Sequence, residues 1–195
     1  MSSTLHRRDV VGALLAQRGE ALVVAGLGST AWDCTAAGDS PLTFPLWGAM
    51  GAAAMVGLGL AIAQPSRRVL VITGDGEMLM GLGSLATIGV QAPRNLAIAV
   101  IDNERYGETG MQATHTAHGV DLAAVAIGCR FASACVVRDT KELDGARESL
   151  LAGGGPVLVQ FKVAAEKLAL VLPPHDGVAL KERFRRALLG ATPAA

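Results

Sequence analysis

The chain has few aromatic and few charged residues, and it has no overall bias in charge. Aromatic side chains make up 4% and charged side chains 17% of its 195 residues, and seventeen basic residues balance seventeen acidic ones. No cluster of basic residues is interleaved with aromatics, which argues against a nucleic-acid partner. The most apolar region, 50–63, is interrupted by glycines and is too short to span a membrane. We therefore expect neither nucleic acid nor a membrane as a partner.

The sequence also has little that points to secretion or to cysteine chemistry. The first nine residues are polar and lack the apolar stretch of a signal peptide, so we expect a cytoplasmic protein. Cys34, Cys129 and Cys135 are odd in number and show no C-x-x-C spacing, which indicates neither a disulfide framework nor a zinc site. We expect all three to be buried free thiols.

What the sequence does have is apolar residues, 51% of the total, and 24 glycines. Short apolar runs predict strands at 21–25, 68–73, 95–102, 131–137 and 157–163. Helical spacing of apolar residues predicts helices at 10–17, 50–63, 78–89, from 121, 139–151 and about 177–189. Nearly continuous apolar strands that alternate with helices favour an α/β fold, a Rossmann-like three-layer sandwich with a mostly parallel sheet and helices on both faces. We expect one domain over 1–195.

Charged residues near both ends of the chain are expected on solvated helix faces. One group is His6, Arg7 and Arg8. The other, in the last predicted helix, is Lys181, Arg183, Arg185 and Arg186, with Phe184, Leu188 and Leu189 facing inward.

A glycine-rich turn, Gly74-Asp75-Gly76, lies between a buried strand and a helix. Glycines let the backbone approach a ligand closely, and the start of a helix offers unpaired N–H donors to a phosphate. The turn by itself is weak support, because an ordinary strand-to-helix turn has the same composition. It becomes informative together with a second polar loop.

The second loop starts 25 residues later, at Asp102-Asn103, again where a buried strand ends. Ligands of open parallel sheets bind beyond the carboxyl ends of the strands, near the point where the strand order reverses. Two neighbouring strand ends would thus present a carboxylate and an amide oxygen to one point. Such hard oxygen ligands suit Mg²⁺ shared with phosphate oxygens.

This pattern, G-D-G and then an asparagine at the end of an apolar strand, resembles the signature of thiamine-diphosphate enzymes. The resemblance implies that thiamine diphosphate and Mg²⁺ bind here. It implies as metal ligands the Asp75 carboxylate, the Asn103 side chain and the backbone carbonyl of Arg105. The family usually has asparagine at the position of Asp102, which is not a ligand. The expected cofactor contacts also include Gly74, Gly76, Tyr106 and Gly107.

Three further segments are similar to cofactor-binding parts of the same family. Trp47-Gly48-Ala49-Met50-Gly51 matches a W-G-x-(large apolar)-G segment, which implies that the Gly48 carbonyl binds the 4′-amino group and that Met50 supports the bent cofactor. Gly28, Ser29 and Thr30 resemble the turn that donates further hydrogen bonds to the diphosphate. Glu77 replaces a frequent serine, and because phosphate repels a carboxylate we expect only its backbone N–H to contribute.

The stretch after the second loop resembles one branch of the family, the sulfopyruvate and phosphonopyruvate decarboxylases. In that branch a T-G-x-Q-A-T run follows the metal loop, and this chain matches it with Thr109, Gly110, Gln112, Ala113 and Thr114. The resemblance covers roughly residues 25–163. It implies decarboxylation of a small anionic 2-oxo acid. Complete enzymes carry a pyrimidine-binding domain with the main catalytic glutamate, for which 195 residues leave no room. The similarity to separate β subunits implies a partner α subunit and a hetero-oligomer, α2β2 or larger.

Candidate substrate-facing residues follow the second loop. Glu108 and Thr109 lie just past the second loop and are candidates to face the substrate, and a solvated helix start remains open as an alternative. His115 and His118 lie in a polar segment and are candidates for binding an anionic tail or transferring a proton. Two other functions also remain open. One is a different thiamine-diphosphate reaction, such as acetolactate-type carboligation, and the other is a non-catalytic subunit that keeps the cofactor fold.

Overall fold

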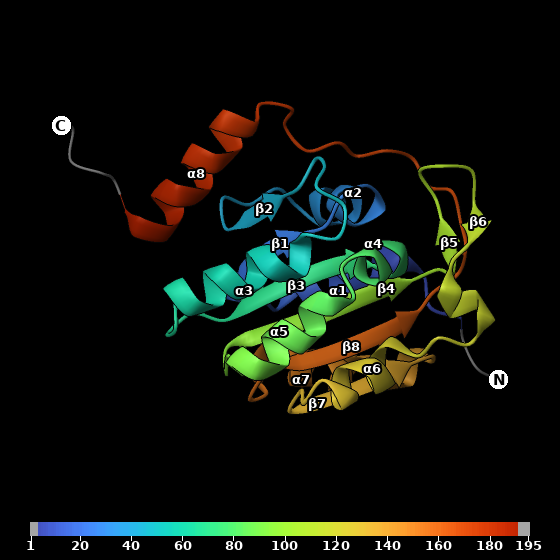
Figure 1. Cartoon of the computed structure of the whole chain (residues 1–195). Coiled ribbons are helices and arrows are strands. Elements are labelled where there is room, and N and C mark those ends of the chain that lie inside the picture. The colour runs from blue at the N-terminus through green and yellow to red at the C-terminus, as the bar shows by residue number, and fades with distance from the viewer. Residues whose placement is uncertain (1–3, 191–195) are drawn as a thin grey trace.

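The computed structural model describes residues 4–190. Within them, six strands form a wholly parallel sheet in the order β2-β1-β3-β4-β8-β7 (Figure 1). The strands are β1 (Leu22–Ala25), β2 (Thr43–Pro45), β3 (Val69–Gly74), β4 (Leu96–Asp102), β7 (Ser133–Val137) and β8 (Val157–Lys162). The predicted parallel sheet is confirmed.

Helices cover both faces of this sheet, as predicted (Figure 1). One face carries α1 (Arg7–Ala16), α2 (Ser29–Ala36) and α7 (Leu143–Ala152). The other carries α3 (Ala53–Ala63), α4 (Asp75–Met80), α5 (Gly83–Gln91) and α6 (Leu122–Gly128). Successive residues of a strand point to opposite faces, so Ala97 and Ala99 join the first core while Ile98 and Val100 join the second. This is why β4 is buried along its whole length.

The order of the strands along the chain reverses between β1 and β3. The polar loops lie at the carboxyl ends of the strands. From β1 the chain passes through α2 to the edge strand β2, and it then returns through α3 to β3 on the other side of β1. Because α2 and α3 cover opposite faces, the carboxyl ends of β1 and β3 border a crevice. This is the place where parallel sheets bind ligands.

Smaller elements surround that end of the sheet. After β4 come the antiparallel strands β5 (Arg105–Tyr106) and β6 (Gln112–Ala113), and then the 3-10 helix η1 (His115–His118). A second 3-10 helix, η2 (Thr140–Glu142), precedes α7. After β8 the chain runs past the β5–β6 hairpin to the last helix, α8 (Gly177–Leu189) (Figure 1). No helix within residues 4–190 is both long and apolar enough to cross a bilayer.

The helix α8 is attached to the edge strand β2. The rings of Phe44 and Phe184 lie 5.5 Å apart, and Arg183 forms an ion pair with Asp39. Leu188 packs against the second core, but Leu189 is 60% exposed, so the expected inward position of Leu189 is wrong. It is the last residue of α8, one position after the packed Leu188, so its side chain points to a different side of the helix.

Besides the short strands β5 and β6 and the 3-10 helix η1, the sequence patterns missed α2 and β2, and one predicted helix is divided. The segments that became α2 and β2 carry no clear apolar periodicity, because α2 is rich in small and polar residues and β2 has three residues. The single helix predicted at 78–89 is two helices that meet at Gly81. A β-carbon on Gly81 would lie 2.2 Å from the carbonyl oxygen of Gly51, so the close approach of that neighbouring loop accompanies the break.

The expected solvated cluster near the start of the chain is wrong for Arg7. Its side chain is buried and forms an ion pair with Asp33 of α2, which is also buried. Arg8 donates to the same carboxylate from Nε at 3.1 Å. Two arginines thus compensate one buried acid, and they join α1 to α2.

The prediction for the thiols is confirmed only in part. Cys34 is buried, whereas Cys129 is partly buried and Cys135 is exposed. Cys135 lies on β7, an edge strand of the sheet with one neighbouring strand, β8, which leaves alternate residues uncovered.

Candidate functional site

A pocket of about 120 Å³ lies where β1, β3 and β4 end, at the predicted edge of the sheet. Most of the candidate residues line it. The lining residues are Leu27, Ser29, Thr30, Met50, Gly74, Asp75, Gly76, Glu77, Ile101, Asn103, Arg105, Tyr106, Gly107, Glu108 and Thr109.

The glycine turn joins β3 to α4 at the floor of this pocket. Gly74 ends the strand with extended backbone angles, and Asp75 begins the helix. A β-carbon on Gly76 would lie 2.6 Å from the Tyr106 ring, so glycine is needed there for the ring to pack over the turn. The two polar loops are therefore in direct contact.

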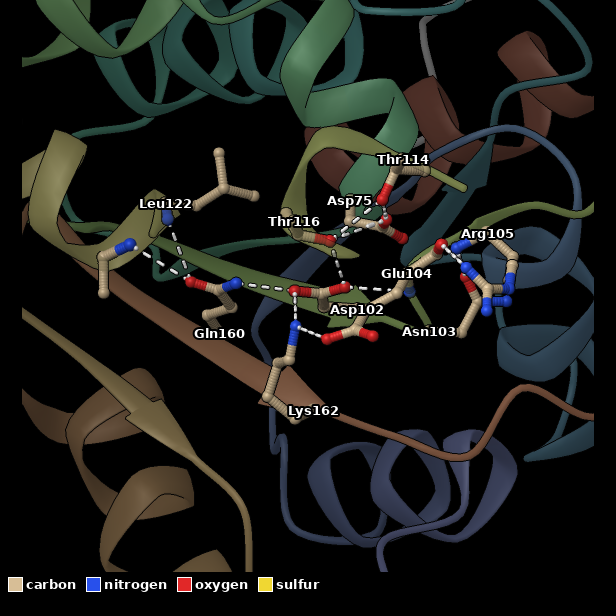
Figure 2. A network of polar contacts seen from close by, with 11 residues as sticks. Asp75, Asp102, Asn103, Glu104, Arg105, Thr114, Thr116, Leu122, Gln160 and Lys162 are labelled. Carbon is tan, nitrogen blue, oxygen red and sulfur yellow. Dashed lines mark hydrogen bonds and ion pairs between the residues drawn. The ribbon is translucent and has the colours of Figure 1, made fainter. Parts of the chain in front are cut away.

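Asp75 is buried, at 2% exposure, and is held by two hydroxyl groups (Figure 2). Its Oδ2 accepts from Thr114 at 2.5 Å and lies 3.3 Å from the hydroxyl of Thr116, so neither contact uses Oδ1. Burial raises the pKa of Asp75 to about 6, the hydroxyl of Thr114 opposes the rise, and the charge of Asp102 adds to it. A nearby cation would favour the charged form of such a group.

The second loop turns sharply after β4. Oδ1 of Asn103 accepts from the backbone N–H of Arg105 at 2.9 Å, and Glu104 between them has a left-handed φ of 61°. An amide oxygen has two lone pairs, so this bond leaves one available. Asn103 and Arg105 line the same pocket as Asp75.

The residues fit a divalent metal in their chemistry. Within residues 4–190, no three His, Cys, Asp or Glu side chains cluster in a way that could hold a metal ion. The candidate set instead combines one buried carboxylate with an amide oxygen and a backbone carbonyl, from Asp75, Asn103 and Arg105. Oxygen ligands of this kind suit Mg²⁺ when phosphate and water complete the shell.

The segment before α3 contributes Met50 to the pocket wall, where its side chain is 38% exposed. Gly48 and Ala49 do not line the pocket. Trp47 is turned toward the chain that leads to α8: its Nε1 donates to the carbonyl of Pro174 at 2.9 Å, and its ring stacks on His175 at 4.6 Å. The segment after β8 thus supports the loop that carries Met50.

The turn after β1 forms the opposite wall. Gly28 has a φ of 70° and precedes α2, and Ser29 and Thr30 line the pocket. A β-carbon on Gly28 would lie 2.8 Å from Oε1 of Glu108, so this side chain rests against the turn. Gly28 itself does not line the pocket.

Glu77 lines the pocket, yet its side chain is buried at 5% exposure. Its Oε2 accepts from the hydroxyl of Thr73 at 2.8 Å, on the strand before the glycine turn. Burial raises the pKa of the Glu77 carboxyl, and hydrogen bonding by Thr73 opposes the rise. The carboxyl is thus engaged with the protein interior.

The candidate substrate-facing residues divide into two groups. Glu108 and Thr109 line the pocket and are exposed, and the Thr109 hydroxyl donates to Gln112 at 2.9 Å. His115 and His118 lie in η1, are exposed and do not line the pocket. The structure does not bring the histidines to the site in this chain.

Several residues of the site were missed by the sequence patterns. Leu27 and Ile101 line the pocket because they flank the two strand ends. Thr114 and Thr116 lie behind it and contact Asp75. Thr114 belongs to the T-G-x-Q-A-T run, which is a signal for it, whereas a threonine two residues further on carries none.

The chain matches a known family and several known proteins. The model described as "Thiamine pyrophosphate enzyme, C-terminal TPP binding domain" matches residues 28–161. The sulfopyruvate decarboxylase subunit beta of Methanothermobacter thermautotrophicus is 37% identical over 188 residues, which covers 96% of this chain and 98% of that protein.

Two longer proteins match in part. The phosphonopyruvate decarboxylase of Streptomyces viridochromogenes is 39% identical over 167 residues, which covers 85% of this chain but 42% of that protein. The structure of benzoylformate decarboxylase from Polynucleobacter necessarius superposes with a TM-score of 0.70 at 20% identity, and covers 85% of this chain and 34% of that one. The chain spans less than half of each, and the second likeness concerns the fold alone.

Proposed function

Because the chain belongs to the thiamine pyrophosphate enzyme family, we propose that it is the diphosphate- and Mg²⁺-binding subunit of a 2-oxo acid decarboxylase and acts with a separate subunit. The observation that carries the proposal is that Asp75, Asn103 and Arg105, on two strand-end loops, line one pocket. The relatives named as sulfopyruvate and phosphonopyruvate decarboxylases support the reaction type.

Thiamine diphosphate, when bound, supplies the electron sink that decarboxylation of a 2-oxo acid requires. Asp75, Asn103 and the carbonyl of Arg105 would hold the Mg²⁺ that grips its diphosphate. The backbones of Ser29 and Gly76 border the same pocket and would donate to the phosphates. These residues bind and orient, which is the part of catalysis that a protein contributes to cofactor chemistry.

Met50 and Gly48 would set the conformation of the cofactor. Met50, in the loop before α3, lines the pocket together with Ser29. An apolar side chain that is 38% exposed in this chain gains burial when a ligand covers it. Glu108 and Thr109 at the outer rim would face a small anionic substrate, with sulfopyruvate and phosphonopyruvate as the first candidates.

A separate α subunit would complete the site in a cytoplasmic hetero-oligomer. The Methanothermobacter relative, which this chain matches over 98% of its length, is named as a subunit beta. The partner would bring the pyrimidine-binding domain and its glutamate. It would also cover the open side of the pocket and exclude water from the reacting atoms.

The test starts from this chain co-expressed with the product of the adjacent open reading frame. Calorimetry measures thiamine diphosphate binding with Mg²⁺ and with a chelator, and CO₂ release is assayed with sulfopyruvate, phosphonopyruvate and pyruvate. We expect Mg²⁺-dependent binding, and CO₂ release from at least one of the two anionic substrates. Turnover of pyruvate alone would indicate another reaction of the family. Binding without CO₂ release from any of the three would contradict the decarboxylase and favour a non-catalytic subunit.

A further inference from the structure

A fully buried acid lies behind the pocket, at the last position of β4. Figure 2 shows the carboxylate of Asp102 among side chains of β8 and η1. Its Oδ1 accepts from the hydroxyl of Thr116 at 2.8 Å and from the backbone N–H of Glu104 at 3.0 Å. Its Oδ2 accepts from Gln160 at 2.6 Å and from Lys162 at 2.9 Å. A carboxylate offers about four acceptor positions, so Asp102 has none left for a metal ion.

The neighbour Gln160 can face this acid in only one orientation. Its Oε1 accepts from the backbone N–H groups of Leu122 and Ala123, at 3.0 and 3.3 Å, where α6 begins. Its amide N–H₂ must therefore point to Asp102 (Figure 2). Residue 102, at the end of β4, therefore has to offer an acceptor to Gln160. A donor at this position would face the donor of Gln160, and one of the two would lack a hydrogen-bond partner.

Lys162 is the cation that contacts Asp102 within residues 4–190. Its ammonium group also forms an ion pair with Glu104, and its side chain is 16% exposed. Removing the cation from a buried ion pair strongly destabilises a protein, because the buried carboxylate then keeps a charge that nothing compensates. Lys162 therefore joins β8 to both the last residue of β4 and the loop that follows.

Two hydroxyl groups connect this buried pair to Asp75. Each hydroxyl carries one proton. The shortest contacts assign the proton of Thr114 to Asp75, at 2.5 Å, and that of Thr116 to Asp102, at 2.8 Å. The two hydroxyl oxygens lie 2.9 Å apart. With both protons used in this way, no hydrogen bond joins the two hydroxyl groups, and they are coupled by direct contact and by the 3.3 Å approach of Thr116 to Asp75. A displacement of Asp102 that moves Thr116 would therefore also move Thr114 and the side chain of Asp75.

We infer that Lys162 is a positioning residue for the metal site. By compensating Asp102 and binding Glu104 it fixes the loop that carries Asn103, and through the two threonines it fixes Asp75. The inference rests on the proposed function, because the metal site is part of that proposal. Residues that support metal ligands typically change metal affinity by about 10- to 100-fold when they are lost.

The same contacts explain why an acid stands where the family usually has asparagine. In one orientation an asparagine at position 102 would present its N–H₂ group to Gln160 and Lys162, and in the other to the backbone N–H of Glu104, and all of these groups are donors here. The acid and the lysine therefore depend on each other. Replacing Lys162 by Met alone would leave the buried charge without its cation, whereas replacing Lys162 by Met and Asp102 by Asn would remove the charge and its cation together and leave only the mismatch of the amide.

The experiment measures the Mg²⁺ concentration at half-saturation of thiamine diphosphate binding, by calorimetry on the complex with the partner subunit. The variants are Lys162→Met, Asp102→Asn and the double variant, with Lys167→Met, an exposed lysine of the following segment, as the matched control. Urea unfolding of each protein is measured in parallel. We expect each single variant to raise the half-saturating Mg²⁺ concentration about tenfold or more, the double variant to raise it by less than the product of the two single effects, and the control to be unchanged.

A lysine with a purely structural role would lower the unfolding midpoint and leave the Mg²⁺ half-saturation of the folded protein unchanged, and this result would overturn the inference alone. If Lys162→Met does not fold, the inference is tested with Asp102→Asn and the double variant. A half-saturating Mg²⁺ concentration in Asp102→Asn equal to that of the wild type would overturn the inference. Absence of Mg²⁺-dependent binding in the wild type would instead overturn the proposed function, and the inference with it.

Discussion

Glu77 fills the space that a side chain on Gly26 would need: a β-carbon on Gly26 would lie 1.9 Å from Oε2 of Glu77. The same oxygen accepts from Thr73 on β3. The backbones of Gly51, Ala53 and Leu27 oppose the rise of the pKa of this carboxyl that burial causes, while its Oε1 has no hydrogen-bond partner within residues 4–190. One buried carboxyl thus connects the turn after β1, the strand β3 and the loop before α3, which together surround the pocket.

Replacing Glu77 should loosen these three segments. In Glu77→Ala the hydroxyl of Thr73 loses its acceptor and a cavity remains, so we expect the free energy of unfolding to fall by about 2–4 kcal/mol. Glu77→Gln keeps the shape and should cost less, about 1–2 kcal/mol. Urea unfolding measures both. Glu20→Ala, at an exposed glutamate, is the control and should stay within about 0.5 kcal/mol of the wild type.

The contact with Gly26 gives this prediction a second test. Gly26→Ala should displace the Glu77 carboxyl and destabilise the wild type, but it should cost less in the Glu77→Ala background, where the space is free. A coupling energy of about 0.5–3 kcal/mol is expected for residues in contact. Strictly additive effects in the double-mutant cycle would show that the two residues do not compete for the space.

Much of the fold follows from the sequence because the central strands are buried on both faces. The runs RVLVIT and NLAIAVID are continuous and apolar, and each is followed by a polar turn, so strand type and strand ends were both predictable. The edge strand β2 has three residues, and α2 begins at a glycine turn without a side-chain cap, so neither has a local signal. The pairing of Arg7 with Asp33 depends on how two helices meet, which local patterns do not contain.

Asp75→Asn is predicted to abolish Mg²⁺-dependent binding of thiamine diphosphate without loss of the fold. Asparagine keeps an acceptor for the hydroxyl of Thr114 but lacks the charge that a divalent cation requires. We expect the affinity in the presence of Mg²⁺ to fall by more than about 100-fold, beyond the usual effect of losing a supporting residue. Calorimetry tests this, and undiminished affinity would refute the site. Asp144→Asn, at an exposed acid of α7, is the control.

The site could be predicted only as far as its motifs extend. Asp75 and Asn103 stand at strand ends, where a parallel sheet gathers its loops, and they line one pocket. The residues behind them come from later segments: Thr116 precedes α6, and Gln160 and Lys162 occupy β8. Their role depends on the register that sets Asp102 beside Lys162, and this register is a tertiary property.

The buried thiol of Cys34 should make stability depend on pH in alkaline solution. Burial raises the pKa of Cys34 far above its ordinary value, and the charge of Asp33 adds to the rise. Below about pH 8 the thiol is protonated in both the folded and the unfolded chain and has no effect. Above that, only the unfolded thiol ionises, which favours the unfolded chain, so the free energy of unfolding falls as the pH rises, by up to about 1.4 kcal/mol per pH unit.

The comparison of wild type with Cys34→Ala isolates this contribution from other alkaline titrations. Urea unfolding between pH 7 and 10 should give a steeper decline for the wild type than for the variant. The variant should also be less stable at pH 7, because it removes a fully packed side chain of the first core. Parallel curves for the two proteins would contradict the assignment.

Met50→Ala should separate cofactor binding from cofactor orientation. The diphosphate end would be held by the strand-end loops, so thiamine diphosphate affinity should fall by less than about tenfold. The opposite wall of the pocket would lose the side chain that supports the bent conformation, and a small misplacement of reacting groups can cost about 100-fold in rate. We therefore expect kcat for CO₂ release to fall about 100-fold in the complex with the partner subunit. Met50→Leu, the control, keeps the apolar volume and should retain most of the rate. Equal rates for Met50→Ala and the wild type would mean that Met50 borders the pocket without supporting the cofactor.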